Sequence, residues 1–318
     1  MKVWQFIKSK YELGTPVMLL YVLESRGSSP GRQGFHMAVS KDGEMCGSIG
    51  GGIMEHKFVE LAKARLMDGI ESNNLYKQIH DKTAGQHQSG MICSGEQTIF
   101  LQQVNQKDLA EINKLLSSLK AGHNGTLCLS ETGITFSAEI PVDDFVFTQS
   151  DEQHFTLVEK TGFKNQLHII GGGHCSLAFS KLMSGMDFHI TVYEERMGLN
   201  TLLQNTSAHK KVILENYSEL SSLITGGNQV YVVIMTVGYR TDDIALRSLL
   251  NQSFRYIGLL GSRKKIEKLF AAFEDSEADT NSLQAIHSPI GLPIKSQTPE
   301  EIAVSIAAEI IAEKNRYQ

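Results

Sequence analysis

The residues with the clearest chemical meaning lie just past the middle of the chain, in the stretch IIGGGHCSLA. A short apolar segment leads into Gly171 and Gly173, and a helical pattern starts at His174. Gly171 permits a sharp turn after a strand, and Gly173 lets backbone amides approach a pyrophosphate at the start of a helix. Glu194 follows 23 positions after Gly171, where an acidic residue binds a ribose hydroxyl and favours NAD over NADP. The same glycines also suit a helix and strand that only pack closely, so a dinucleotide site and a plain scaffold both stay open.

A second glycine cluster lies in the N-terminal half, in the stretch CGSIGGGIMEHK. Gly50, Gly51 and Gly52 precede a helical pattern whose first turn carries Glu55. Successive backbone amides at a helix start form an anion nest that suits a phosphate or a polar heterocycle. Glu55 has a simpler alternative role, because a carboxylate in the first turn complements the helix dipole.

The stretch HDKTAGQHQSGMICSGE holds two histidines and a cysteine, His80, His87 and Cys93. Their spacing is irregular and no second cysteine is near, so we predict a polar loop and no metal site. Cys93 stands beside Ser94 in this loop. An exposed thiol there can act as a nucleophile or a soft ligand, which makes Cys93 the candidate catalytic residue. A buried and inert cysteine fits the sequence equally well.

A third candidate site lies in YIGLLGSRKK, where Gly261 ends an apolar strand pattern and Ser262 is a good N-cap. Arg263 adds positive charge at the start of the helix. An anionic ligand over the carboxyl edge of a parallel sheet would meet these groups. The alternative is an ordinary solvated helix start.

Composition limits the classes of function. The formal net charge is -5 and the pI is about 6.1, whereas a nucleic-acid-binding protein needs a basic surface. No apolar run is long enough to span a bilayer, and no signal peptide is visible at the N-terminus. The four cysteines are far apart in the sequence, which favours a reducing compartment. We therefore expect a cytoplasmic protein that binds neither nucleic acid nor membrane.

The order of elements predicts an α/β protein with two domains. Residues 1–163 read as an α+β domain that includes a hairpin turning at Asp42 and Gly43. Residues 164–318 alternate strands and helices, which predicts a doubly wound, Rossmann-like parallel sheet. In this domain one helix is expected from about Asp242, and another begins with a capping box from Thr298 to Glu301.

Taken together, these stretches resemble the XdhC/CoxI family, accessory proteins for the maturation of molybdenum hydroxylases such as xanthine dehydrogenase. The resemblance is carried by five blocks: RGSSPGRQGFHMAVSKDGEMCGSIGGGIME, CSGE, IIGGGHCSLA, YIGLLGSRKK and SPIGLPIKSQTPEEIAVSIAAEI. They run from Arg26 to Ile310 and so cover nearly the whole chain.

The resemblance implies an N-terminal XdhC/CoxI domain followed by a Rossmann domain. It also implies an activity, which is to bind the pyranopterin molybdenum cofactor, support its sulfuration with a cysteine desulfurase, and deliver it to an apo-hydroxylase. Family members commonly form homodimers. On this basis we expect a cofactor-binding maturation factor and not a turnover enzyme, with cofactor contacts drawn from the glycine clusters and their neighbours: Gly50, Gly51, Gly52, Glu55, Gly171, Gly173, His174, Glu194, Gly261, Ser262 and Arg263.

The chain departs from the family pattern at several positions. Cys93-Ser94-Gly95 stands where the family tends to have Cys-Gly-Gly, and Ile53 stands where a small residue or cysteine is common. Val237 follows Thr236 where the family tends to have histidine. The alternative function is an NAD-dependent oxidoreductase, which needs a proton-transfer group near the nicotinamide. Val237 removes the obvious candidate for that group.

Overall fold

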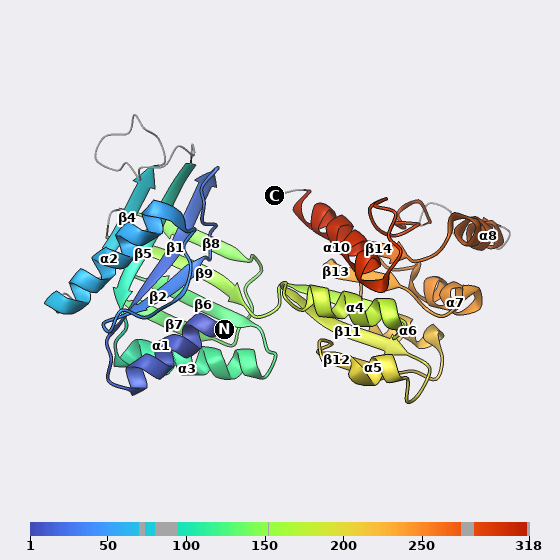
Figure 1. Cartoon of the computed structure of the whole chain (residues 1–318), viewed down its shortest axis with the longest axis horizontal. Coiled ribbons are helices and arrows are strands. Elements are labelled where there is room, and N and C mark those ends of the chain that lie inside the picture. Colours follow the sequence, from blue (N-terminus) through green and yellow to red (C-terminus); the bar gives the residue numbers. More distant parts are fainter. Residues whose placement is uncertain (70–73, 80–94, 152, 275–282, 317–318) are drawn as a thin grey trace. The chain divides into compact units, whose positions relative to one another are not determined.

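The computed structural model describes residues 1–318 apart from 70–73, 80–94, 152, 275–282 and 317–318. It divides the chain into two compact units, Met1–Gly162 and Phe163–Gln318. Figure 1 shows that each unit has its own sheets, covered by its own helices. Among the described residues, no helix combines the length and apolar character needed to cross a membrane.

The described residues of the first unit form three helices and two antiparallel sheets. One sheet has the strand order β3-β2-β1-β5-β4 and the other the order β7-β6-β9-β8. The elements are α1 (Lys2–Glu12), β1 (Val17–Gly27), β2 (His36–Ser40), β3 (Met45–Gly47), α2 (Gly52–Asp68), β4 (Asn74–Ile79), β5 (Gly95–Gln103), α3 (Gln106–Lys120), β6 (Gly125–Ser130), β7 (Gly133–Ser137), β8 (Phe145–Gln149) and β9 (Phe155–Thr161).

Strand β1 is buried on both faces and separates two hydrophobic cores. Val17 and Leu19 belong to the core shared with α1, α3 and the second sheet. Met18 and Leu20 point to the opposite face, against α2. Because successive side chains of a strand alternate between faces, a continuous apolar run is what a central strand between two cores requires.

The second unit contains a five-stranded parallel sheet with the order β12-β11-β10-β13-β14. Its elements are β10 (Asn165–Ile170), α4 (His174–Met183), β11 (Phe188–Glu194), α5 (Asn200–Gln204), β12 (Lys210–Ile213), the 3-10 helix η1 (Tyr217–Glu219), α6 (Leu220–Leu223), β13 (Gly227–Ile234), α7 (Tyr239–Leu249), β14 (Phe254–Leu259), α8 (Arg263–Glu274) and α10 (Pro299–Asn315).

Helices cover both faces of this sheet, and each face has its own core. Leu246 of α7 and Leu269 of α8 pack with Val232 of β13 on one face. Phe179 of α4 and Ile306 of α10 pack on the other. A parallel sheet with helices on both faces is the Rossmann-like architecture. The predicted fold class, a doubly wound parallel sheet joined to a domain with antiparallel sheets, is therefore confirmed.

The local predictions are also confirmed, with one correction. Gly43 has φ +89° in the turn between β2 and β3, and Thr298 forms the capping box with Glu301 at the start of α10. Helix α7, however, begins at Tyr239 and not near Asp242. Gly238 is the N-cap, so Asp242 lies one turn inside the helix.

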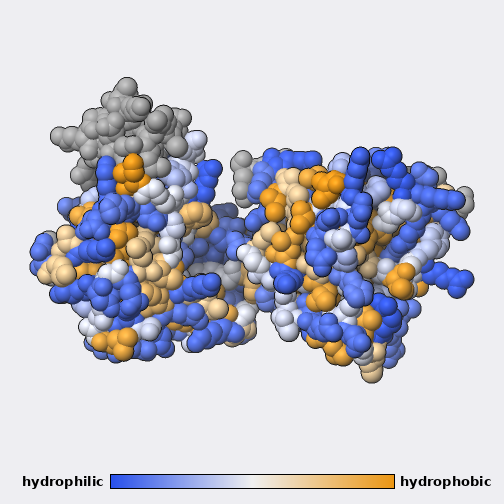
Figure 2. Space-filling view, viewed as in Figure 1, coloured by the Kyte–Doolittle hydropathy of each residue, from blue (hydrophilic) through white to orange (hydrophobic). Residues whose placement is uncertain are grey.

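The surface of both units is mostly hydrophilic on the face seen in Figure 2, with hydrophobic side chains between the polar ones. Some large apolar side chains are exposed, among them Ile53 at 60% and Val237 at 75%. Val237 immediately precedes the N-cap of α7, at the edge of the sheet where the candidate site lies.

Candidate functional site

The candidate site is built at the carboxyl edge of the parallel sheet, where the winding of the chain reverses. Strands β10 and β13 are neighbours in the sheet but are not consecutive in the chain. The loops after them therefore lead to opposite faces, and this switch point is where α/β proteins bind ligands. Gly171 follows β10 with φ +107°, and a Cβ built on it would lie 2.4 Å from the Met235 carbonyl oxygen. Only glycine fits where the two loops come this close.

The turn after β10 leads directly into α4. Gly173 is the N-cap of this helix, and a Cβ built on it would meet no atom within 4 Å. The amides at a helix start carry partial positive charge and favour an anion. The open space beside Gly173 thus lies where the predicted phosphate contact requires it.

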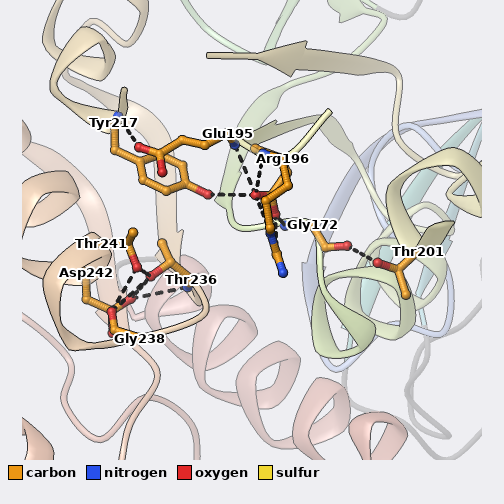
Figure 3. A network of polar contacts seen from close by, with 10 residues as sticks. Gly172, Glu195, Arg196, Thr201, Tyr217, Thr236, Gly238, Thr241 and Asp242 are labelled. Atoms are coloured by element: carbon orange, nitrogen blue, oxygen red, sulfur yellow. Dashed lines mark hydrogen bonds and ion pairs between the residues drawn. The ribbon is translucent and has the colours of Figure 1, made fainter. Parts of the chain in front are cut away.

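Gly172 joins this turn to the next elements through two hydrogen bonds. Its amide donates to Glu194 Oε2 over 2.8 Å, and its carbonyl accepts from the Thr201 hydroxyl over 2.5 Å (Figure 3). Both bonds connect the glycine turn to residues that follow it in sequence, Glu194 at the end of β11 and Thr201 in α5. The conformation of the turn is therefore held by side chains that are buried beneath it.

Glu194 is 1% exposed and binds several donors of the protein itself. Its Oε1 accepts from the amides of Glu195 and Arg196, each at 3.0 Å, and from Arg196 Nε at 2.9 Å. Its Oε2 accepts from Arg196 Nη2 at 2.7 Å, besides the Gly172 amide. Burial by itself would raise the pKa of Glu194, but these hydrogen bonds and the Arg196 charge lower it to about 2. A carboxylate has about four acceptor sites, so a ribose hydroxyl would have to replace one of these donors.

Tyr217 closes the network behind Glu194. Its amide donates to Glu195 Oε1 over 2.8 Å, and its hydroxyl donates to Glu194 Oε1 over 3.4 Å (Figure 3). Burial raises the pKa of Tyr217, and the charges of Glu194 and Glu195 raise it further. The phenol therefore stays protonated and acts as a donor.

A second polar cluster follows β13 on the other side of the switch point (Figure 3). The Thr236 hydroxyl donates to Asp242 Oδ1 over 2.5 Å, and the Thr236 amide donates to the same oxygen over 3.2 Å. Thr241 Oγ1 lies 2.6 Å from Thr236 Oγ1 and donates to the Gly238 carbonyl over 2.9 Å. A Cβ built on Gly238 would meet no atom within 4 Å. This cluster offers hydroxyl groups and an open helix start beside the turn of Gly171.

Asp242 is completely buried, at 0% exposure, and forms an ion pair with Lys265. Lys265 belongs to the first turn of α8, in the segment that also contains Gly261, Ser262 and Arg263. Ser262 Oγ accepts from the Lys265 amide over 3.4 Å, which agrees with the expected N-cap.

The glycine cluster of the first unit is organised around Glu55. Glu55 Oε2 accepts from the amides of Ile49 and Gly51, both at 3.0 Å, and from the Ser48 hydroxyl at 2.6 Å. The Gly50 amide donates to Ser48 Oγ over 3.1 Å. The carboxylate of Glu55 thus occupies part of the amide nest itself, while a Cβ built on Gly51 would meet no atom within 4 Å.

The structure brings most of the candidate residues to one edge. The residues that follow strands β10, β11 and β14 lie at the carboxyl edge of the parallel sheet: Gly171, Gly173, His174, Glu194, Gly261, Ser262 and Arg263. The candidate residues of the first unit lie together at the start of α2: Gly50, Gly51, Gly52 and Glu55. Cys93, like His80 and His87, lies outside the described residues. Within the described part of the chain, no group of three or more His, Cys, Asp or Glu side chains is arranged to hold a metal ion.

Several residues of this edge were not predicted as site residues from the sequence, among them Arg196, Tyr217 and Asp242. A signal existed for Asp242, because it follows the strand-and-glycine pattern VVIMTVG by only a few positions. No such signal marked Tyr217, which reaches Glu194 from a separate short helix.

Fold and site together define a two-unit protein whose second unit is a Rossmann domain with an open glycine turn at its switch point. Two family models match the sequence, one described as the XdhC Rossmann domain over residues 167–310 and one as the XdhC and CoxI family over residues 11–73. The chain therefore belongs to the XdhC/CoxI family, and the resemblance seen in the sequence is confirmed.

Two curated relatives match along nearly all of the chain. The uncharacterized protein YqeB of Escherichia coli is 23% identical over 314 residues, which are 96% of this chain but 44% of YqeB. This chain thus spans less than half the length of YqeB. A Bacillus subtilis protein, named as a probable subunit of xanthine dehydrogenase, is 24% identical over 317 residues, covering 94% of this chain and 93% of that protein.

A solved structure has the same fold throughout. The crystal structure of a protein described as a xanthine dehydrogenase from Bacillus halodurans aligns with a TM-score of 0.73 and 21% identity. The alignment covers 100% of this chain and 97% of that one. At 21% identity, the structural similarity between the two proteins shows that they share a fold.

Proposed function

We propose that this chain is an accessory protein of a xanthine dehydrogenase-type molybdenum hydroxylase. In this proposal it binds the pyranopterin molybdenum cofactor, supports its sulfuration together with a cysteine desulfurase, and delivers it to the apo-hydroxylase as a homodimer. Membership of the XdhC/CoxI family supports the proposal. The name of the Bacillus subtilis relative, which refers to xanthine dehydrogenase, points to the same partner.

The observation that carries the proposal is the open glycine turn at the switch point. The cofactor is a pterin with a phosphate group, and the start of α4 beside Gly173 offers backbone amides and free space for such a group. The hydroxyl oxygens of Thr236 and Thr241, whose hydrogens are already donated to Asp242 and to the Gly238 carbonyl, offer acceptors for the N–H groups of a polar heterocycle. These residues therefore fit the group, which when bound supplies the molybdenum centre that the hydroxylase needs.

Within this proposal the residues of the edge bind and orient the cofactor. Gly173 and His174 contact its phosphate, and Glu194 keeps the glycine turn in its binding conformation through Gly172. The glycine nest of the first unit, around Gly51, is also proposed to bind an anionic or polar group.

Replacing Gly173 with valine tests the proposal. The new Cβ would stand in open space, since no atom lies within 4 Å of it, and the added side chain would extend into the space proposed for the phosphate. We expect Gly173→Val purified from cells that make the cofactor to lose at least about tenfold in molybdenum and pterin per chain, or about 1.4 kcal/mol of binding. Gly185→Val is the matched control, because the nearest atom to a Cβ there is 3.8 Å away and the residue lies beyond α4. Equal loading of the two variants would contradict the proposal.

Sulfur handling is proposed for Cys93, because sulfur ligands suit a soft or sulfido-bearing centre. We expect Cys93→Ala to fold normally but to retain less cofactor, or to deliver less of its sulfurated form. The measurement is bound molybdenum per chain together with the activity of a reconstituted apo-hydroxylase. Cys46→Ala and Cys175→Ala are the comparison variants. If one of these lowers both quantities while Cys93→Ala does not, the assignment is wrong.

The second candidate function is that of an NAD-dependent oxidoreductase, which the glycine turn and the acidic residue ending β11 favour. Glu194, Glu195 and Arg196 together carry a net charge of -1, which disfavours a ribose 2′-phosphate. If a dinucleotide binds, we expect NAD to bind about tenfold more tightly than NADP, or about 1.4 kcal/mol. Calorimetric titration with both nucleotides measures this, and equal affinities would contradict it.

A further inference from the structure

Three basic residues follow one another at the start of α8, and only the third turns toward the protein. Arg263 and Lys264 are exposed. The Lys265 side chain is 26% exposed, and its Nζ pairs with Asp242 and donates to the Leu260 carbonyl over 3.4 Å. Its stem passes over Gly261, where a Cβ would lie 3.1 Å from Lys265 Cδ.

Asp242 holds the Lys265 ammonium in this position. The carboxyl group is fully buried, and its Oδ1 is bound by the amide and hydroxyl of Thr236. Its Oδ2 faces Lys265 Nζ and has no other partner among the described residues. Removing one member of a buried ion pair is costly because it leaves an uncompensated charge. The ammonium is therefore kept beside Asp242.

The pair lies at the same edge as the glycine turn. Thr236 hydrogen-bonds to Asp242 and also lies against the glycine turn. A Cβ built on Gly171 would be 2.9 Å from the Thr236 Cα. The open positions at Gly173 and Gly238 belong to the helices that start at this edge. An ammonium group has three donors, so Lys265 keeps one N–H after it has bound Asp242 and Leu260.

We propose that Lys265 binds a phosphate or pyrophosphate group of the ligand at this edge, with Asp242 as its positioning residue. The inference rests on the proposed function, since it adds one residue to the same site. Lys265 keeps its bond to Asp242 and donates its remaining N–H to the anion. Lys265 must keep both contacts, because an anion that drew Lys265 away would leave the buried charge of Asp242 without its counter-charge.

The test compares two neighbouring lysines. Lys265→Met removes the inward ammonium, and Lys264→Met removes an exposed one from the same helical turn. We expect Lys265→Met to bind ADP and inorganic pyrophosphate at least about tenfold more weakly than the wild type by calorimetry, and Lys264→Met to change the affinity less than about twofold. If Lys265→Met binds both probes as tightly as Lys264→Met, the pair is only structural and the inference is overturned.

A double variant covers the case in which Lys265→Met does not fold, since it leaves Asp242 without its counter-charge. Asp242→Asn combined with Lys265→Gln removes both charges and keeps a pair of side chains that can hydrogen-bond. Neutral replacement of a buried ion pair is far less damaging than removal of one partner. We expect this variant to fold and to show the same loss of affinity. Wild-type affinity in the folded double variant would overturn the inference.

Two sources can supply the phosphate, a nucleotide or the pterin, and separate measurements distinguish them. Titration with ADP reports the nucleotide, and pterin fluorescence after oxidation of the purified protein reports the cofactor. If Gly173→Val abolishes binding and Lys265→Met does not, the inference fails while the proposed function stands. A wild-type chain that binds no probe and carries no pterin would overturn both.

Discussion

The carboxylate of Glu194 is expected to be a main stabilising group of the second unit, and replacing it with glutamine tests this. The amide keeps the size of the side chain but loses the charge that Arg196 faces. It also turns one acceptor oxygen into an NH2 group, opposite backbone amides that themselves donate. At least one donor of this buried network would lose its partner.

The magnitude follows from the pKa. Burial opposes ionisation of Glu194, yet the hydrogen bonds of Arg196 and Gly172 lower its pKa from 4.5 to about 2. At roughly 1.4 kcal/mol for each pKa unit, the ionised group contributes about 3 kcal/mol to the free energy of unfolding at neutral pH. We expect Glu194→Gln to lose about this amount.

The dependence on pH has a definite sign. Because the pKa of Glu194 is lower in the folded state, its contribution is complete above the unfolded pKa of about 4.5 and is lost as the pH falls toward 2. The difference in stability between wild type and Glu194→Gln should therefore shrink by about half between pH 7 and pH 3.

The assay is urea unfolding followed by far-UV circular dichroism at several pH values. The single tryptophan, Trp4, is buried in the first unit, so its fluorescence serves as an internal control that should not change. Glu267→Gln, at an exposed position of α8, is the matched control variant and should cost less than about 0.5 kcal/mol. A loss below about 1 kcal/mol at pH 7, or a difference that stays constant on acidification, would refute the reasoning.

Three further predictions concern backbone and packing, and urea unfolding measures each of them. Gly171→Ala should cost at least about 2 kcal/mol, because φ is +107° and the Cβ would lie 2.4 Å from a carbonyl oxygen; Gly185→Ala should change stability by less than about 0.5 kcal/mol, and equal effects would contradict the strained turn. Ser176→Ala should be neutral or stabilising by up to about 1 kcal/mol, because the hydroxyl is buried without a hydrogen-bond partner in the described part of the chain; a loss above this size would reveal a missing partner. Thr298→Ala should cost about 1 kcal/mol by removing the bond to the Glu301 amide, whereas Thr298→Ser should keep most of it.

Much of the candidate site could be predicted because its glycines have local reasons to be where they are. Gly171 has a positive φ and lies close to the backbone of the loop after β13. Gly173 is the N-cap at which the turn passes into α4. Both positions belong to a strand–turn–helix unit of about ten residues, and such a unit leaves a pattern in the sequence. Glu194 was found for the same reason, as the acidic end of the following strand.

The partners of those residues could not be predicted in the same way. Tyr217 and Thr201 reach the glycine turn from elements separated from it in the chain. The inward turn of Lys265 depends on a buried carboxylate from another helix. Three consecutive basic residues look alike in a sequence, and only the position of Asp242 distinguishes the third.

The sequence by itself determined the class of fold, the family and the strand ends that carry Gly171, Glu194 and Gly261, because apolar periodicity and glycine placement are local properties of the chain. Tertiary structure alone decided which charges meet at the carboxyl edge of the sheet. Strand order places the loop after β13 beside the loop after β10, and packing of α7 against α8 places Asp242 beside Lys265. Ion pairs and hydrogen bonds act over a few ångströms in space, whatever the separation in sequence, so the chemistry of this edge exists only after the chain has folded.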